Sequence, residues 1–206
     1  MYTGHYASAL LLKRAVPQVP LWQLFLAAQG LDLLFFALVP LGVERVSIDP
    51  TQSGNLALQL AYMPWSHSLL AAALLGGAVA LAGRTRASVA LGLAVSSHWL
   101  LDLPMHTPDL PLAAGDGPVF GWGLWTHPIL AWAFEVGLLI LSWFVHGTSN
   151  RRVLALVLVL LIIQTLNSFV IPLPTSTLAL SLLSQGTYVA FALAARWAER
   201  LGPPHV

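Results

Sequence analysis

The stretch Ser96–Leu112, "SSHWLLDLPMHTPDLPL", ends an apolar run that is long enough to cross a membrane. It nevertheless carries four ionisable side chains, His98, Asp102, His106 and Asp109. An ionisable side chain at membrane depth is costly unless it is paired with another group or binds an ion. The stretch therefore predicts a membrane helix whose end carries a functional site.

The composition of the whole chain also indicates a membrane protein. Of its 206 residues, 57% are hydrophobic and 8% are charged, a share that one small soluble core cannot bury. The net charge of +1, with the nine Lys and Arg residues scattered, predicts no nucleic-acid partner. Because the chain has no Cys, it has no disulfides, thiolate metal sites or Cys nucleophiles. Any metal site must use His, Asp and Glu.

Six stretches have the length, about 17–25 residues, that a helix needs to cross the hydrocarbon of a bilayer. They are residues 21–43, 64–82, 87–104, 122–145, 153–171 and 177–198. Residues 3–14 are too short to cross and predict a half-helix. We therefore predict an all-α fold in which residues 1–206 form a single membrane domain, a helix bundle of six transmembrane helices plus a short N-terminal half-helix.

The basic residues predict the orientation of this bundle. All but Arg45 fall on one face: Lys13, Arg14, Arg84, Arg86, Arg151, Arg152, Arg196 and Arg200. By the positive-inside rule that face is cytoplasmic. We expect a multi-pass protein of the bacterial inner (cytoplasmic) membrane, in contact with membrane lipid, with both termini in the cytoplasm. The two longest connections, 44–63 and 105–121, then face outward.

Several ionisable groups of the predicted spans fall at similar depths. With a rise of about 1.5 Å per residue, Asp32, His98 and Glu135 lie roughly 15–17 Å from the cytoplasmic end of their spans. His67 and Asp102 lie at roughly 22 Å. These groups can therefore form one cluster in the bundle.

The N-terminal half-helix reaches the same zone. If Lys13 and Arg14 lie at the cytoplasmic surface, His5 lies about 12 Å inward. The half-helix would then carry His5 to the cluster.

The spacing of His98 and Asp102, i and i+4, puts both on one helix face, an arrangement that offers two ligands to one metal ion. We predict five metal ligands: His5, Asp32, His67, His98 and Asp102. Imidazole and carboxylate ligands suit a divalent metal, zinc first, with manganese or iron as alternatives. A divalent cation would also neutralise carboxylates at that depth. The alternative is that burial keeps the carboxylates protonated.

Other ionisable residues have weaker signals. Glu135 and His127 are candidates for the general base or acid, and each has a structural alternative, as a protonated packing residue or a hydrogen-bonded His. Asp32 can instead bridge helices through Gln29 or Gln164. His106 and Asp109 lie beyond Pro104 in a predicted outer loop. There we expect ordinary solvated residues that shape the mouth of the site.

The order of these motifs resembles the family of predicted bacterial inner-membrane metal-dependent hydrolases. The matching residues are the Gly-His that ends at His5, Asp32, "SHSLLA" with His67, and "SHWLLD" with His98 and Asp102. In that family a Gly-His, an Asp-rich segment, a Thr-His-Ser and a His-x-x-x-Asp are the proposed metal ligands. The match covers about the first 115 residues.

Two departures from the family pattern are visible. The Pro-Asp-x-Asp-His segment is represented only by "QGLDLL", and the His-Arg-Gly before the Thr-His-Ser is replaced by "YMPW". Fewer ligands imply one metal ion where the family would hold two, or a site that has lost catalysis.

The first functional hypothesis is an integral-membrane metal-dependent hydrolase that acts on a lipid-like or amphiphilic substrate through a metal-activated water. The second is a proton-coupled transporter or permease, in which Asp32 and Glu135 titrate. The third is a non-catalytic accessory subunit of a larger membrane complex, and a homo-oligomer is also open. Bound metal, flux across a membrane and stoichiometric partners discriminate among them.

Overall fold

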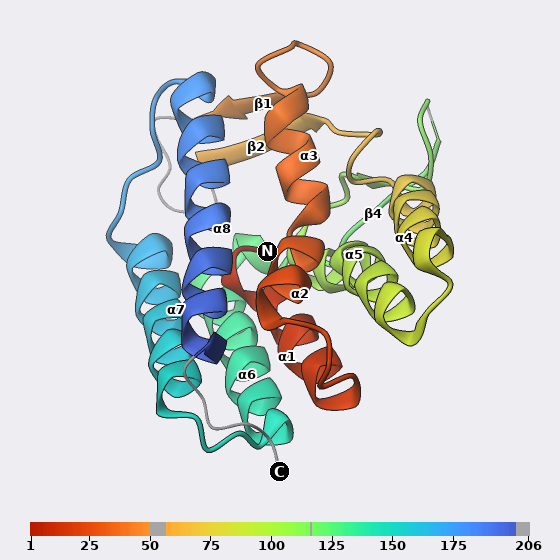
Figure 1. Cartoon of the computed structure of the whole chain (residues 1–206). Helices are drawn as coiled ribbons and strands as arrows, with labels where there is room; N and C mark the ends of the chain where they lie inside the picture. The colour runs from red at the N-terminus through yellow and green to blue at the C-terminus, as the bar shows by residue number, and fades with distance from the viewer. Residues whose placement is uncertain (50–56, 116, 201–206) are drawn as a thin grey trace.

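The computed structural model describes residues 1–49, 57–115 and 117–200, and over these ranges the chain is mostly helical (Figure 1). The described α-helices are α1 (Tyr6–Ala15), α2 (Leu21–Ala28), α3 (Gly30–Leu38), α4 (Leu69–Gly83), α5 (Arg86–Met105), α6 (Pro128–His146), α7 (Arg151–Phe169) and α8 (Thr177–Arg200). Short 3-10 helices, η1 (Thr3–His5) and η3 (Leu124–Thr126), precede α1 and α6. The prediction of a mostly helical chain is confirmed.

Three of the helices, α6, α7 and α8, are long and apolar enough to cross a membrane. The pair α2 and α3 meets the same criterion when it is taken as one bent span. The other two predicted spans correspond to α4 and α5, which do not meet it among the described helices: α4 has 15 residues, and α5 carries several polar side chains. The six-span arrangement therefore stays a prediction.

The first predicted span is a broken helix, bent by 49° between α2 and α3. The break falls at Gln29, which is fully buried and donates its side-chain amide to the carbonyl oxygen of Tyr2 (2.9 Å). Asp32 consequently lies in the first turn of α3, where the helix dipole stabilises a carboxylate. The bend turns this carboxylate toward the interior.

The second and third predicted spans form a close hairpin of α4 and α5. A Cβ atom on Gly92 would lie 2.3 Å from the carbonyl oxygen of Gly76, so only glycine permits this approach. Helix α4 begins at Leu69, later than the predicted residue 64, because Ser68 caps its N-terminus and accepts from Ala71 N (3.1 Å). The turn before the cap carries His67.

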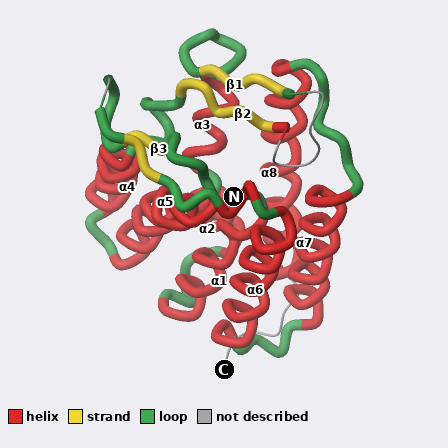
Figure 2. The backbone as a smooth tube through the Cα atoms, turned by 180° about the vertical axis from the view of Figure 1, so that it is seen from behind, coloured by secondary structure: helices red, strands yellow, loops and turns green. Residues whose placement is uncertain are grey.

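The N-terminus lies near the middle of the molecule in both views (Figure 1, Figure 2). Helix α1 packs against α2, α5 and α6, and it buries Tyr6 and Leu10 completely. Residues Thr3–His5 of η1 are buried as well. The predicted half-helix is thus a core element, and it ends beside the ionisable groups.

Two small antiparallel hairpins lie in the upper half of Figures 1 and 2. Strand β1 (Arg45–Ile48) pairs with β2 (Leu58–Tyr62), and β3 (Leu110–Pro111) pairs with β4 (Val119–Phe120). They belong to the two long connections that we predicted on a common face. The wholly helical prediction is corrected by these strands.

Candidate metal centre

The structure brings the five predicted ligands together from four separate parts of the chain. They are buried side chains from η1, from α3, from the turn before α4, and from α5: His5, Asp32, His67, His98 and Asp102. Two overlapping triads, His5/His98/Asp102 and Asp32/His67/His98, each have ligand atoms within 4.8 Å of one another. The depth counted along the predicted spans placed these groups in the same zone.

Four of these side chains, Asp32, His67, His98 and Asp102, form what we call the four-ligand cluster. Asp32 Oδ1 lies 3.2 Å from His67 Nε2 and 3.6 Å from His98 Nε2. Asp102 Oδ2 lies 3.2 Å from His98 Nε2 and 3.8 Å from His67 Nε2. Ligands about 2.0–2.1 Å from a tetrahedral zinc ion are separated from one another by about 3.3 Å. The four distances within the cluster, 3.2–3.8 Å, lie near that spacing.

The tautomer of His98 follows from its contact with the backbone. His98 Nδ1 lies 2.7 Å from the carbonyl oxygen of Ala28. Because a carbonyl oxygen only accepts, Nδ1 carries the proton, and Nε2 of the neutral ring carries a lone pair. That Nε2 has no hydrogen-bond partner among the described residues and faces the carboxylates of Asp32 and Asp102. A metal ion or a proton on Nε2 can balance these carboxylates.

A chain of hydrogen bonds from Glu44 through Ser66 orients His67 so that its Nε2, like that of His98, faces Asp32. Ser66 Oγ donates to Glu44 Oε2 (2.6 Å), so it accepts from His67 Nδ1 (2.7 Å). The Nε2 lone pair of the neutral ring then points to Asp32. Glu44 is buried and also accepts from the backbone N–H groups of Trp65 (2.8 Å) and Ser66 (2.9 Å). Metal-bound His residues are commonly oriented through their second nitrogen in this way.

His5 is held by a stack and by its own segment. Its ring lies on that of His98, with 3.6 Å between centroids, and its Nε2 lies 3.2 Å from Asp102 Oδ1. Neither ring nitrogen of His5 has a hydrogen-bond partner among the described residues. Burial lowers the pKa of His5 to about 3, which favours the neutral ring, the form that binds metals. The amino group of Met1 also contacts Asp102 Oδ1.

Glu135, a predicted acid or base, is fully buried and contacts the backbone of the N-terminal segment. Its Oε2 accepts from the N–H groups of Tyr2 (2.9 Å) and Gly4 (3.0 Å), next to His5. His127, the other candidate, is exposed at the N-terminus of α6. Neither is among the described residues that line the cavity beside the cluster. The contacts of Glu135 indicate that it positions the segment that carries His5.

We expected His106 and Asp109 to be solvated loop residues, and for His106 this expectation is wrong. His106 is buried: its Nε2 lies 3.6 Å from Asp102 Oδ1, and its ring packs on Trp125, with 4.2 Å between centroids. Burial lowers the pKa of His106. Its Nδ1 lies 2.8 Å from Asp109 Oδ1, and Thr107 Oγ1 donates to Asp109 Oδ2 (2.9 Å). Tertiary packing, which a loop sequence does not reveal, places this His beside the cluster.

Tyr188 of α8 is a further site residue that the sequence did not single out. It is buried, and its hydroxyl donates to Asp32 Oδ2 at 3.0 Å. Asp32 Oδ1 is thereby left to face His67 and His98. One oxygen of this carboxylate is fixed and the other is presented to the cluster. The Gln29 and Gln164 bridges that we considered for Asp32 are not the contacts observed.

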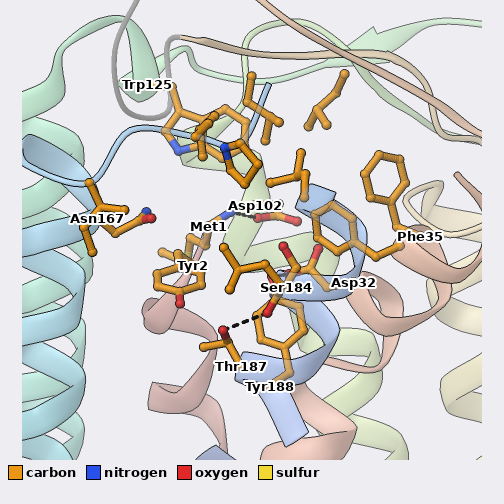
Figure 3. Close-up of a pocket in the computed structure, with 18 of the residues that line it drawn as sticks. Met1, Tyr2, Asp32, Phe35, Asp102, Trp125, Asn167, Ser184, Thr187 and Tyr188 are labelled. Atoms are coloured by element: carbon orange, nitrogen blue, oxygen red, sulfur yellow. Dashed lines mark hydrogen bonds and ion pairs between the residues drawn. The ribbon is translucent and has the colours of Figure 1, made fainter. Parts of the chain in front are cut away.

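A cavity of about 370 Å³ lies beside the cluster (Figure 3). The carboxylate and imidazole groups of its wall are Asp32, His67, Asp102 and His106, and further polar side chains come from Tyr2, Asn167, Ser184, Thr187 and Tyr188. The rest of the wall is predominantly apolar and comes mainly from α3, β2, α7, the connection after α7, and α8. The four-ligand cluster therefore borders a space in which a small molecule can bind.

Comparisons of the chain with models of protein families, with curated proteins and with solved structures give no significant match. The resemblance inferred from the motifs therefore stays a prediction. The chemistry of the site has to be argued from its residues.

Proposed function

We propose that the protein is an integral-membrane metal-dependent hydrolase of a lipid-like or amphiphilic substrate. The observation that carries the proposal is the geometry of the four-ligand cluster, in which His98 Nε2 faces the carboxylates of Asp32 and Asp102. Two imidazoles and two carboxylates suit zinc, with manganese or iron as alternatives. The proposal includes the six-span topology in the bacterial inner membrane with both termini in the cytoplasm.

The residues of the chain would divide the work as their contacts indicate. Asp32, His67, His98 and Asp102 would hold the ion, with His5 beside Asp102 as a further ligand. A divalent ion bound there lowers the pKa of a water molecule to about 7 and polarises the bond to be cleaved.

Other residues would orient these ligands and line the substrate space. Glu44, acting through Ser66, would fix the ring of His67, and Tyr188 would fix Asp32. His106, held by Asp109, presents Nε2 at the cavity wall, where it can hydrogen-bond an entering ligand. The acid–base roles predicted for Glu135 and His127 stay predictions.

Elemental analysis of the purified protein tests the proposal. We expect a stoichiometric transition metal in the wild type and its loss when His98→Ala and Asp102→Ala are combined. The matched control is His127→Ala, which removes an exposed imidazole and should leave the metal content unchanged. A wild-type protein without metal, or a double variant that keeps it, would show that the hydrolase proposal is wrong.

One observation favours the transporter alternative. The broken helix α2–α3 places Asp32 at the N-terminus of its second half, as in the discontinuous helices of transporters. In that case proteoliposomes would show a flux that Asp32→Asn abolishes, and the purified protein would contain no bound metal. The metal content therefore separates the two functions.

A further inference from the structure

The apolar wall of the cavity is built from pieces that are far apart in the chain. Phe35 and Phe36 come from α3, and Leu58 and Leu60 from β2. The remaining apolar side of the wall consists of α7, the connection after it and α8, with Ile163, Ile171, Pro172, Leu173, Pro174, Leu180 and Leu183. Figure 3 shows the rings of Phe35 and Tyr188 near the polar end at Asp32 and Asp102. The space is thus amphiphilic, with one polar end and a longer apolar part.

Helix α8 presents a single face to this cavity. Its lining residues are spaced by three and four positions, as one helical face requires: Leu180, Leu183, Ser184, Thr187 and Tyr188. The outward positions Leu178, Leu182, Val189 and Leu193 are exposed. Because α8 is long and apolar enough to cross a membrane, the outward face suits contact with lipid tails. The helix therefore separates the cavity from the apolar exterior.

The end of α7 and the connection that follows it offer a way in. Ile171 and Leu183 line the cavity, yet they are 44% and 56% exposed. Pro172 and Pro174 lie in the same connection and have no backbone N–H to leave unsatisfied in apolar surroundings. An apolar group can therefore pass from the exterior into the cavity between this connection and α8.

The charged groups and the volume of the cavity limit the kind of ligand that it can bind. Among the described residues that line it, no Lys or Arg is present, and the carboxylate and imidazole groups are those of Asp32, His67, Asp102 and His106. Its volume of about 370 Å³ is near the lower end of the range for ligand pockets. The space suits one chain better than a lipid with two.

We propose that this cavity holds one aliphatic chain of the substrate, inserted from the bilayer between the α7–α8 connection and α8, with the bond to be cleaved at the four-ligand cluster. The proposal rests on the proposed function for the position of the bond. The chain site itself rests on the cavity and its lining.

Photolabelling of the protein in lipid nanodiscs tests the chain site. The probe is a fatty alcohol with a diazirine at the end of its chain, a molecule without a metal-binding group. We expect it to label the cavity positions Ile171, Leu180 and Leu183 as well as the outward positions Leu178 and Leu182. An excess of unlabelled fatty alcohol or isoprenoid alcohol should compete only at the cavity positions. Competition by either alcohol supports the proposal, and the stronger competitor identifies the kind of chain.

Ser184→Phe should lower labelling at the cavity positions about tenfold, because the added ring takes the place of several methylene groups of the chain. The matched control is Leu182→Phe on the exposed face of the same helix, which should leave cavity labelling unchanged. Labelling at the outward positions serves as an internal reference in both variants.

The proposal is wrong if competition at the cavity positions is no greater than at the outward positions in the wild type, an outcome that needs no variant. It is also wrong if a folded Ser184→Phe protein is labelled in the cavity as the wild type is. Because binding of the aliphatic chain needs no metal, competed labelling in a wild-type protein that contains no metal would refute the hydrolase proposal and keep the chain site. Bound metal without competed labelling would support the hydrolase proposal and refute the chain site.

Discussion

His98 Nδ1 lies 2.7 Å from the carbonyl oxygen of Ala28, a residue on the other side of the break between α2 and α3 from Asp32. This contact fixes the proton on Nδ1 and turns the lone pair of Nε2 toward the carboxylates of Asp32 and Asp102. The last turn of α2 orients the imidazole, and the first turn of α3 supplies a carboxylate next to it. The broken helix thus builds two parts of one site.

Glu44→Gln should weaken metal binding about 10- to 100-fold, as loss of an orienting partner usually does. The carboxamide can donate to Ser66, which would reverse the hydrogen-bond chain and put the proton of His67 on Nε2, facing Asp32. Competition with a chelator measures the affinity. Glu199→Gln, which alters a carboxylate paired with Lys13, is the matched control. An affinity equal to that of the wild type would exclude the hydrogen-bond chain.

Tyr188→Phe should lower metal affinity about tenfold, because a hydrogen bond to a charged group contributes about 1.5–3 kcal/mol and part of it is lost when Asp32 can move. The hydroxyl is the only group removed, so the packing of the ring is kept. Tyr62→Phe removes a hydroxyl from a 40% exposed ring and should change nothing. The same chelator titration measures the metal affinity of both variants. Equal affinities would contradict the role of Tyr188.

Glu135→Leu should lower the thermal stability and the metal content together, because the N–H groups of Tyr2 and Gly4 lose their acceptor next to His5. Glu135→Gln keeps an acceptor oxygen and should retain both properties. Thermal unfolding in detergent and elemental analysis provide the comparison. If Glu135→Gln kept its metal and fold but lost a metal-dependent activity, Glu135 would be the acid or base predicted from the sequence.

Removal of the metal by a chelator should lower the unfolding temperature of the wild type, since the buried carboxylates of Asp32 and Asp102 lose a cation that balances their charge. An ion at about 100 times its Kd stabilises a protein by about 2.7 kcal/mol, and adding zinc back should restore that stability. The variant with both His98→Ala and Asp102→Ala should not respond to the chelator. An unchanged melting curve for the wild type would argue against a structural role for the ion.

Much of the site could be predicted from the sequence because its ligands lie in regular helices or at their ends. The i, i+4 spacing of His98 and Asp102 and the depth of Asp32 needed only helix geometry. The short N-terminal segment carried its own signal, since it was too short to cross a membrane and had two basic residues at its end. These features depend on local periodicity, which a single sequence contains.

The remaining parts depend on contacts between distant segments. The break at Gln29 is accompanied by a hydrogen bond to Tyr2, and no Pro marks the break. Glu44 and His106 lie in connections, where sequence patterns do not indicate which side chains fold inward. The same holds for the apolar cavity, which joins α3, β2, α7 and α8.

X-ray absorption spectroscopy of the metal in the purified protein tests the central claim most directly. We predict a first shell of nitrogen and oxygen ligands at about 2.0–2.1 Å with two imidazoles in the four-ligand cluster, and a third if His5 joins. His67→Ala should remove one imidazole from the spectrum, and His127→Ala should leave it unchanged. A metal with an all-water shell, or a spectrum that His67→Ala does not alter, would contradict the account.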